Sequence, residues 1–462
     1  MIRPVNRRQS RYQMDMCSGP LLRKIVIVAV PLILSGILQL LFNTTDLIVV
    51  GRFASYKALA AIGVTGAVVQ LMINICLGMS VGTNVLVARY LGAQQRSHVS
   101  RTVHTAILFS LAGGVVMTIS GICLTRPLLR LLNTPDNIMD MAALYLQIYF
   151  AGMPGSMLYN FGSSILRASG DTRRPFYFLV IGGVINVLLN LFFVLVCGWD
   201  VGGVATATIA AQALSGVLVL RVLVQSRNFC RVKLSNLKIH WSYLRDILWI
   251  GIPSSFQGAC FALANLWIQT ALNTYGAEIL AASTTASAWD AIGFLLSTAL
   301  GQTVVSFVSQ NYGGKQYSRI WKSIKYASIL CTCATFLYCF GIWIFLEEAL
   351  ALFNKNPEVI FWGKIKLHIL LPLMFICNLQ EIWISGLRGL GYSIGPTIMM
   401  IFCIAGLRLV WLFTIYSMFP SFQMLMLTYP FTWSAAALMS WIYLRYALKK
   451  LPGKDDVRIS KI

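Results

Sequence analysis

Twelve long apolar segments follow one another along almost the whole chain, and they restrict how it can fold. A helix needs about 20 apolar residues to cross the hydrocarbon core of a bilayer. Each segment is therefore long enough to form a transmembrane helix. The expected spans are residues 25–50, 58–83, 99–124, 141–165, 175–197, 202–224, 244–272, 280–309, 321–346, 361–386, 396–417 and 423–446.

The composition agrees with a membrane protein. Of the 462 residues, 57% are hydrophobic and 11% are charged, whereas an ordinary soluble domain has roughly 25% charged residues. The net charge of +22 comes from basic residues between the apolar segments, where they are expected to face anionic lipid headgroups rather than nucleic acid. The sequence therefore predicts an all-α polytopic membrane protein.

The placement of Lys and Arg predicts the orientation. Positive loops tend to remain in the cytoplasm. With the N-terminus inside, 29 basic residues fall on the cytoplasmic side and one, Arg408, falls within a span. We therefore expect both termini in the cytoplasm. The seven on the outer side are Arg52, Lys57, Arg126, Arg130, Lys355, Lys364 and Lys366.

The chain contains an internal duplication. When the second half is laid over the first, segment 166–170 (LRASG) matches 387–391 (LRGLG), and Pro175 matches Pro396 at the same shift. Pro31 and Pro253 match at a shift that is longer by a single position. Each half would then hold six helices that begin and end inside, which makes the repeats parallel. The alternative is that the duplication only builds a large scaffold, but two six-helix bundles with a cavity between them are typical of secondary transporters.

The duplication predicts five parts of the chain. They are a cytoplasmic tail (1–24), an N-terminal six-helix lobe (25–224), a cytoplasmic linker (225–243), a C-terminal six-helix lobe (244–447) and a second cytoplasmic tail (448–462).

Several motifs together resemble the multidrug and toxic compound extrusion (MATE) family. They are segment 43–51 (NTTDLIVVG), segment 166–171 (LRASGD), Asn186 with Asn190, and segment 310–314 (QNYGG). The resemblance covers residues from about 20 to about 450. It implies a cation-coupled exporter of amphipathic, often cationic, organic compounds, located in the bacterial inner membrane and working as a monomer by alternating access.

Asp46 is the strongest candidate for a functional residue. An ionisable residue at bilayer depth costs at least ~2.5 kcal/mol, so its presence there suggests a function. Asp46 shares a helical stripe with Ser35, Gln39 and Asn43, which makes one face of the first span polar. We expect Asp46, with Gln39 and Asn43, to take part in cation coupling. The alternative is an ordinary interhelical hydrogen bond.

The resemblance extends this site. Asn186 and Asn190 are spaced i, i+4 in the fifth span, and Thr208 lies in the sixth. With Asp46 they correspond to the family's cation site in the N-terminal lobe. The position of Asn190 is often aspartate in the family, so this pocket would carry a single negative charge. One proton or one sodium ion would neutralise it. For the two asparagines, helix–helix hydrogen bonding is the alternative.

The second half carries a different set of intramembrane charges, namely Asp290, Glu381 and Arg408. A buried arginine is tolerated when it is paired, so we expect either Glu381 or Asp290 to supply the counter-charge of Arg408. A carboxylate left without a partner would attract cationic substrates. Residues expected to line the substrate cavity, besides these three, are Tyr149, Met153, Trp289 and Phe375, because methionine and aromatic side chains accept many ligand shapes.

Other functions receive less support. No nucleophile–base motif, Walker loop or metal-ligand spacing is present in the sequence, so neither an enzyme nor a cofactor nor a bound metal is expected. The alternative within the same superfamily is a flippase for lipid-linked saccharides. Twelve spans and acidic intramembrane residues favour the exporter, with H⁺ or Na⁺ as the coupling ion.

Overall fold

The computed structural model describes residues 13–53, 55–226 and 228–452. Within these ranges the regular structure is entirely helical. Ten helical stretches are long and apolar enough to cross a membrane, with mean hydropathy between 1.5 and 2.7. Two further rods, described below, match the remaining spans. The prediction of an all-α polytopic membrane protein is confirmed, and twelve spans in two repeats agree with the structure.

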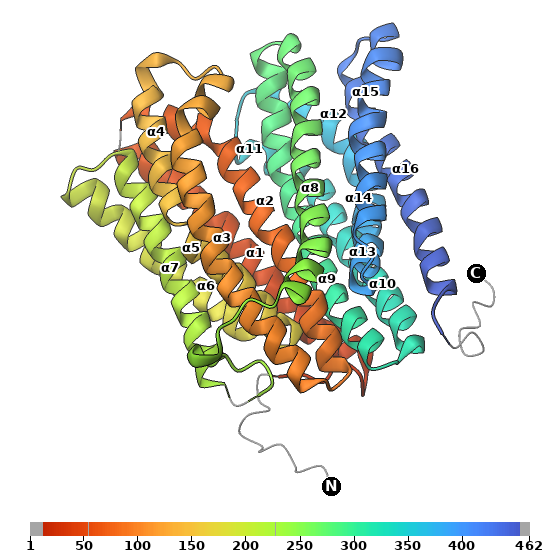
Figure 1. Ribbon diagram of the computed structural model, residues 1–462. Helices are drawn as coiled ribbons and strands as arrows, with labels where there is room; N and C mark the ends of the chain where they lie inside the picture. The colour runs from red at the N-terminus through yellow and green to blue at the C-terminus, as the bar shows by residue number, and fades with distance from the viewer. Residues whose placement is uncertain (1–12, 54, 227, 453–462) are drawn as a thin grey trace. The chain divides into compact units, whose positions relative to one another are not determined.

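The first half of the chain forms six rods, coloured from red to green in Figure 1. The fourth expected span is two helices rather than one, because the chain bends at Gly152, just before Pro154, which has no backbone N–H. A side chain at Gly152 would overlap Ile209, so glycine lets this bend approach the neighbouring helix. The helices are α1 (Leu21–Phe53), α2 (Tyr56–Gly92), α3 (Arg96–Leu131), α4 (Asp136–Ala151), α5 (Met153–Ala168), α6 (Arg173–Leu191) with a π-helical turn (Phe192–Val196), and α7 (Val201–Gln225).

The second half also forms six rods. Pro372 lies in a 3₁₀ turn (Leu371–Leu373) that interrupts the tenth span, and two π-helical turns (Ile401–Gly406 and Leu412–Tyr416) interrupt the eleventh. The helices are α8 (Trp241–Leu272), α9 (Ala277–Gly313), α10 (Tyr317–Ile344), the short α11 (Leu346–Ala351), α12 (Pro357–Leu370), α13 (Met374–Leu390), α14 (Ile394–Met400), α15 (Leu407–Trp411) and α16 (Phe422–Lys449).

The chain divides into two compact units. Among the described residues, unit 1 comprises 13–16 and Val30–Ser255, and unit 2 comprises Cys17–Ala29 and 256–452. Of the three boundaries between these stretches, one lies before α1, one within α1 and one within α8. The five parts expected from the duplication, with lobes at 25–224 and 244–447, stay a prediction.

Two glycines of α6 hold unit 1 together around the region of Asp46. A Cβ at Gly183 would overlap the ring of Phe42 on α1, and one at Gly182 would overlap the hydroxyl of Ser215 on α7. Without side chains there, α6 packs closely against both neighbours. This packing brings the polar residues of α1, α6 and α7 within hydrogen-bonding reach.

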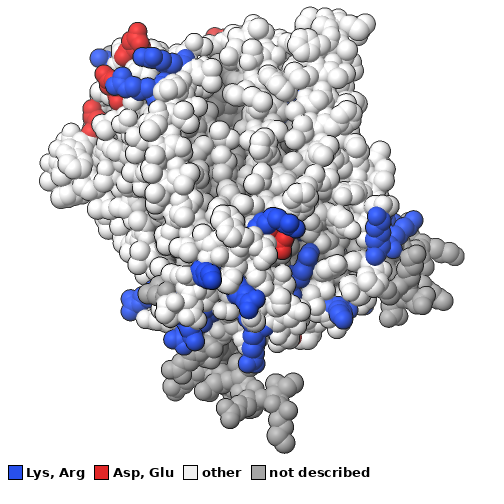
Figure 2. Space-filling model, viewed as in Figure 1, with Lys and Arg blue, Asp and Glu red and all other residues white. Residues whose placement is uncertain are grey.

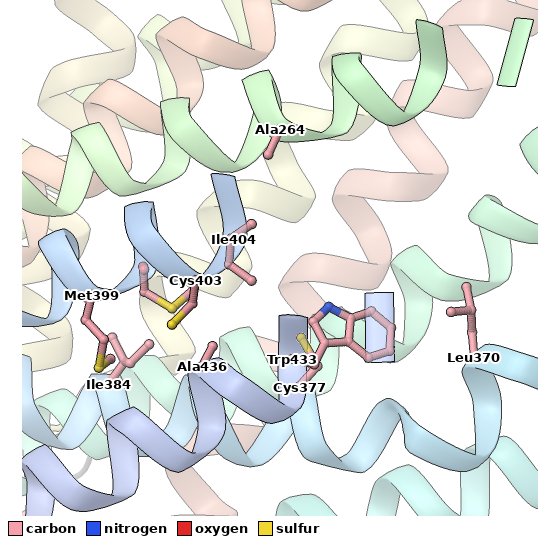
Figure 3. Packing of buried hydrophobic residues seen from close by; sticks show 10 residues of the cluster. Ala264, Leu370, Cys377, Ile384, Met399, Cys403, Ile404, Trp433 and Ala436 are labelled. Atoms are coloured by element: carbon pink, nitrogen blue, oxygen red, sulfur yellow. The ribbon is translucent and has the colours of Figure 1, made fainter. Parts of the chain in front are cut away.

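Unit 2 has a buried cluster with residues from α8, α12, α13, α14, the π-helical turn Ile401–Gly406 and α16. Trp433 of α16 lies among Ala264 of α8, Cys377 of α13, and Cys403 and Ile404 of the π-helical turn (Figure 3). The indole ring also meets Phe294 of α9 edge to face, with centroids 5.9 Å apart. Large aromatic rings in such clusters supply much of the packing energy.

Charged side chains are concentrated near helix ends in unit 1. Where α3 meets α4, Arg126 donates to Asp140 at 2.8 Å. Acidic and basic side chains lie together at this end of the unit, whereas basic side chains predominate at the other end on the face shown in Figure 2. Such an asymmetry is what the positive-inside rule uses. The cytoplasmic orientation of both termini stays a prediction.

Candidate functional site

Four polar residues of α1, α6 and α7 meet in unit 1. Asn190 donates its side-chain N–H to Oδ1 of Asp46. In the amide orientation that gives both its ends a partner, Asn186 donates to the same oxygen at 2.9 Å and accepts from the backbone N–H of Thr208 at 3.3 Å. The structure therefore brings together Asp46, Asn186, Asn190 and Thr208, which we call the Asp46 site.

The Asp46 site contains oxygens suited to a hard cation or a proton. Both amide donors contact Oδ1 of Asp46, and no described side chain donates to its Oδ2. The side-chain oxygen of Asn190 is buried and lacks a hydrogen-bond partner within the described ranges. Carboxylate and amide oxygens are hard ligands of the kind that Na⁺ and other hard cations accept. The arrangement can hold one monovalent cation, or a proton on the carboxylate.

Gln39 and Asn43 are not part of this hydrogen-bonded group. They lie on α1 before Asp46, and their side chains are exposed in unit 1. No hydrogen bond joins either of them to another side chain of the described chain. The polar stripe predicted for the first span is present in the sequence, but only Asp46 of this stripe reaches α6.

A second polar group continues from the Asp46 site along α7. Gln212 lies one turn after Thr208 and accepts a hydrogen bond from Ser156 of α5. It also hydrogen-bonds the hydroxyl of Tyr149, whose ring stacks on Tyr145 with centroids 6.3 Å apart. The i, i+4 spacings of Thr208 with Gln212 and of Tyr145 with Tyr149 are the sequence signal that would have extended the site this far.

The other residues predicted to line a cavity have packing contacts. Met153 is fully buried at the start of α5. Trp289 donates its indole N–H to the carbonyl of Ala349 at 3.3 Å. Phe375 stacks on Phe336, with centroids 5.2 Å apart. These contacts join neighbouring helices of their own units.

The carboxylate of Asp290 has a cationic partner that the sequence did not identify. The ammonium of Lys366 on α12 lies 3.8 Å from Asp290 on α9. It also donates to the carbonyl of Ser283 at 3.0 Å and to the hydroxyl of Ser287 at 2.6 Å. Lys366, which the sequence analysis assigned to the outer side, is 3% exposed. A buried ammonium group is costly unless it is paired and hydrogen-bonded, and Asp290, Ser283 and Ser287 provide these contacts.

Glu381 is paired within its own helix. Its Oε1 lies 3.2 Å from Nη1 of Arg388, two turns later on α13. Arg388 also donates to the side-chain oxygen of Gln257 on α8 at 2.7 Å. The expectation that Glu381 or Asp290 pairs with Arg408 is therefore wrong, because each carboxylate has a nearer cation.

Arg408 instead lies between aromatic rings. Its side chain is 0% exposed. It donates to the side-chain oxygen of Asn265 at 2.7 Å, and its guanidinium carbon lies 4.7 Å from the ring centre of Tyr429 and 5.6 Å from that of Phe261. No carboxylate of the described residues lies within ion-pair distance. Cation–π contacts with these two rings stabilise the charge of the guanidinium.

Together, two groups of intramembrane helices and a hydrogen-bonded carboxylate define a polytopic transporter with a candidate ion site. Comparison with known proteins gives the family. The MatE family model matches residues 31–192 and again residues 253–414. The chain belongs to the MatE family, which confirms the resemblance seen in the sequence, and the family consists of transporters rather than enzymes. The repeated match also reproduces the internal duplication.

Individual relatives agree with this assignment. The probable multidrug resistance protein YoeA of Bacillus subtilis is 26% identical over 93% of this chain and 94% of its own length. The probable multidrug resistance protein NorM of Thermotoga maritima is 24% identical over 84% of each chain. The solved structure of a multidrug resistance MATE family transporter of the MOP superfamily, in an outward-facing conformation, has the same fold, with a TM-score of 0.88 at 21% identity over 94% of this chain and 98% of its own. The protein is a multi-pass membrane transporter of the MatE family.

Proposed function

We propose that this transporter is a secondary active antiporter that exports amphipathic or cationic small organic compounds, driven by inward movement of H⁺ or Na⁺. The observation that carries the proposal is the pairing of the intramembrane carboxylates. Asp290 is paired with Lys366 and Glu381 with Arg388. Asp46 has no cationic partner among the described residues and is held only by neutral amides.

An unpaired carboxylate at bilayer depth responds to ions in a way that a paired one does not. With the site empty, the negative charge costs free energy in the low-dielectric surroundings. Binding one proton or one sodium ion removes that cost, so the conformation that holds the ion is stabilised. An antiporter needs this difference, with access to the site alternating between the two sides of the membrane.

The exporter is tested in proteoliposomes that contain the purified protein and an ethidium-like cation. An imposed pH gradient and an imposed sodium gradient are applied separately. We expect one of them to drive transport, and Asp46→Asn to abolish it. Asp140→Asn is the matched control, because Asp140 is an exposed acid of the same unit paired with Arg126. Gradient-driven transport that persists in Asp46→Asn contradicts the proposal.

The remaining parts of the proposal concern location. We propose a bacterial inner-membrane protein that works as a monomer, with both termini in the cytoplasm. The excess of basic residues on one side of the predicted topology supports the orientation. Fusions of a cytoplasmic fluorescent reporter and of a periplasmic phosphatase to the C-terminus test it. An active phosphatase and a dark fluorescent reporter would place the C-terminus outside the cytoplasm and contradict the proposed orientation. No observation on the structure favours the flippase alternative.

A further inference from the structure

Arg408 lies in an irregular part of its helix. The five residues of α15 are enclosed by π-helical turns on both sides, Ile401–Gly406 and Leu412–Tyr416. Such turns inside helices are frequent at functional sites. Here they place a guanidinium, 0% exposed, against Asn265 of α8 and Tyr429 of α16.

The guanidinium retains unused hydrogen-bonding capacity. Nη1 donates to Asn265, but Nε and Nη2 have no acceptor among the described residues. The guanidinium carbon lies over the rings of Phe261 and Tyr429, which offer no conventional acceptor atom to these N–H groups. A buried guanidinium with unused donors is costly, and an anion in its plane would relieve that cost.

The acids of unit 2 singled out within its spans do not supply this anion. Asp290 is engaged by Lys366, and Glu381 by Arg388. An anion that pairs with Arg408 would therefore come from outside the described chain. Arginine binds carboxylates well because its planar fork of donors matches the two carboxylate oxygens.

Aromatic groups continue from Arg408 into the core of unit 2. The ring of Tyr429, which contacts the guanidinium, lies 5.9 Å from that of Trp433. The indole N–H of Trp433 is buried and has no acceptor within the described ranges. Trp433 itself lies in the apolar cluster with Ala264 and Cys377 (Figure 3). Next to the cation there is thus an aromatic, largely apolar environment with one further unused donor.

We propose that unit 2 binds the carboxylate of an aromatic organic anion at Arg408. The carboxylate accepts from Nε and Nη2, and the aromatic body lies against Tyr429 and its neighbours. This site adds aromatic compounds that carry a carboxylate, zwitterions included, to the proposed substrate class. Its role in transport rests on the proposed function. Binding itself requires no ion gradient.

The test uses the full-length protein in detergent, without a gradient, and benzoate as the probe. Benzoate is expected to raise the melting temperature and to bind in equilibrium dialysis, whereas neutral benzamide at the same concentration does neither. Chloride is tested in the same two measurements as a small inorganic anion. A benzamide response equal to that of benzoate overturns the proposal, and so does a chloride response as large as that of benzoate, because the ligand would then be a small inorganic anion.

Variants locate the binding. Arg408→Met is expected to weaken benzoate binding by about tenfold or more, as the loss of a charge-assisted pair predicts. Arg408→Lys keeps the positive charge but loses the planar pair of N–H donors. Its affinity for benzoate is expected to lie between those of the unsubstituted protein and Arg408→Met. Arg445→Met is the matched control, because Arg445 also lies over an aromatic ring, that of Trp441 at 4.5 Å, but is half-buried near the end of α16.

The melting temperature without ligand gives an independent result. If the guanidinium of Arg408 lacks a counter-charge, Arg408→Met is expected to melt at the same temperature as the unsubstituted protein or higher. Unchanged benzoate binding in both Arg408→Met and Arg408→Lys would overturn the proposal. Such a failure would leave ion-driven efflux of cations untouched, since the efflux assay uses Asp46 and a different substrate.

Discussion

Asn190 of α6 donates a hydrogen bond to Asp46 of α1, joining two residues that are 144 positions apart in the sequence. Asn186 donates to the same carboxylate oxygen. The carboxylate thus lies in a neutral environment of amide groups. Its charge is balanced neither by a lysine nor by an arginine of the described chain, and this makes the Asp46 site sensitive to the binding of a single cation.

Asn190→Asp is expected to increase the response of the site to sodium. The substitution places a second carboxylate next to the first, and two adjacent negative charges repel each other unless a cation lies between them. At ~4 Å and an effective dielectric constant of about 20 this interaction amounts to about 4 kcal/mol. We therefore expect at least a ~10-fold lower sodium concentration for half-maximal thermal stabilisation.

The control for this experiment is Asn43→Asp. Asn43 lies on α1 near Asp46, but it is exposed and outside the hydrogen-bonded group. The substitution Asn43→Asp introduces the same negative charge, but outside the Asp46 site. An equal sodium response in the two variants would show that the effect of Asn190→Asp does not depend on contact with Asp46.

Lys366→Met is expected to destabilise unit 2 strongly. The substitution leaves the carboxylate of Asp290 buried without its cation, which typically costs about 3–5 kcal/mol. The double variant Asp290→Asn/Lys366→Met removes both charges. Its loss of unfolding free energy should be less than half of that in Lys366→Met. Thermal or denaturant unfolding in detergent measures both.

Lys364→Met provides the comparison for this pair. Lys364 forms an ion pair with Glu347 and precedes Lys366 on the same helix, α12, but both side chains of its pair are substantially exposed. Exposed pairs contribute about 0–1 kcal/mol. If Lys364→Met and Lys366→Met were equally destabilised, burial would not be the reason for the importance of Lys366.

Gly183→Ala is expected to weaken the packing of α6 on α1. A methyl group at this position overlaps the ring of Phe42, so the ring or α1 itself must shift away from α6, at a cost of about 1–3 kcal/mol. Because Asp46 follows Phe42 by one turn, the variant should also lose gradient-driven transport. Gly63→Ala adds a methyl that meets no atom within 4 Å beyond the backbone of its own helix. Its transport should be unchanged, and its stability should not fall, because alanine is favoured over glycine inside a helix by up to ~1 kcal/mol.

His104→Ala is expected to loosen the segment between α7 and α8. Nε2 of His104 accepts a hydrogen bond from the backbone N–H of Lys233 at 2.9 Å, while Nδ1 lies 2.7 Å from the carbonyl of Ser100. The neutral ring with its proton on Nδ1 satisfies both contacts. Loss of the hydrogen bond between Lys233 and His104 should make local opening of this segment easier by about 1 kcal/mol. The rate of trypsin cleavage after Lys233 should then rise about fivefold.

His368→Ala is the histidine control for this proteolysis. The ring of His368 contacts the carbonyl of Lys364 within α12 and takes no part in holding the segment after α7. A cleavage rate that rises equally in both variants would mean that the loss of His104 acts through general destabilisation. The size and time course of the fragments distinguish cleavage after Lys233 from cleavage elsewhere.

The pairing of charges shows where prediction from the sequence stopped. Glu381 and Arg388 lie two turns apart on one helix, a spacing that puts them on the same face, so their pairing was accessible from the sequence. Asp290 and Lys366 lie far apart in the sequence, on different helices. Their contact depends on how α9 and α12 are rotated about their axes and how deeply each lies in the bundle. Sequence periodicity does not determine either quantity.

What the sequence determined by itself is the part of the structure imposed by the membrane. A segment in hydrocarbon must satisfy its own backbone hydrogen bonds, so apolar length alone predicts helices and their approximate ends. The repeat and the polar positions on those helices are also written in the sequence. Only the tertiary structure decided which polar groups meet. Asp46 reaches two asparagines because Gly183 lets α6 approach α1, and Arg408 is left without an acid because nearer cations engage Asp290 and Glu381. These outcomes depend on contacts of a few ångströms between helices, where a small rotation exchanges one partner for another.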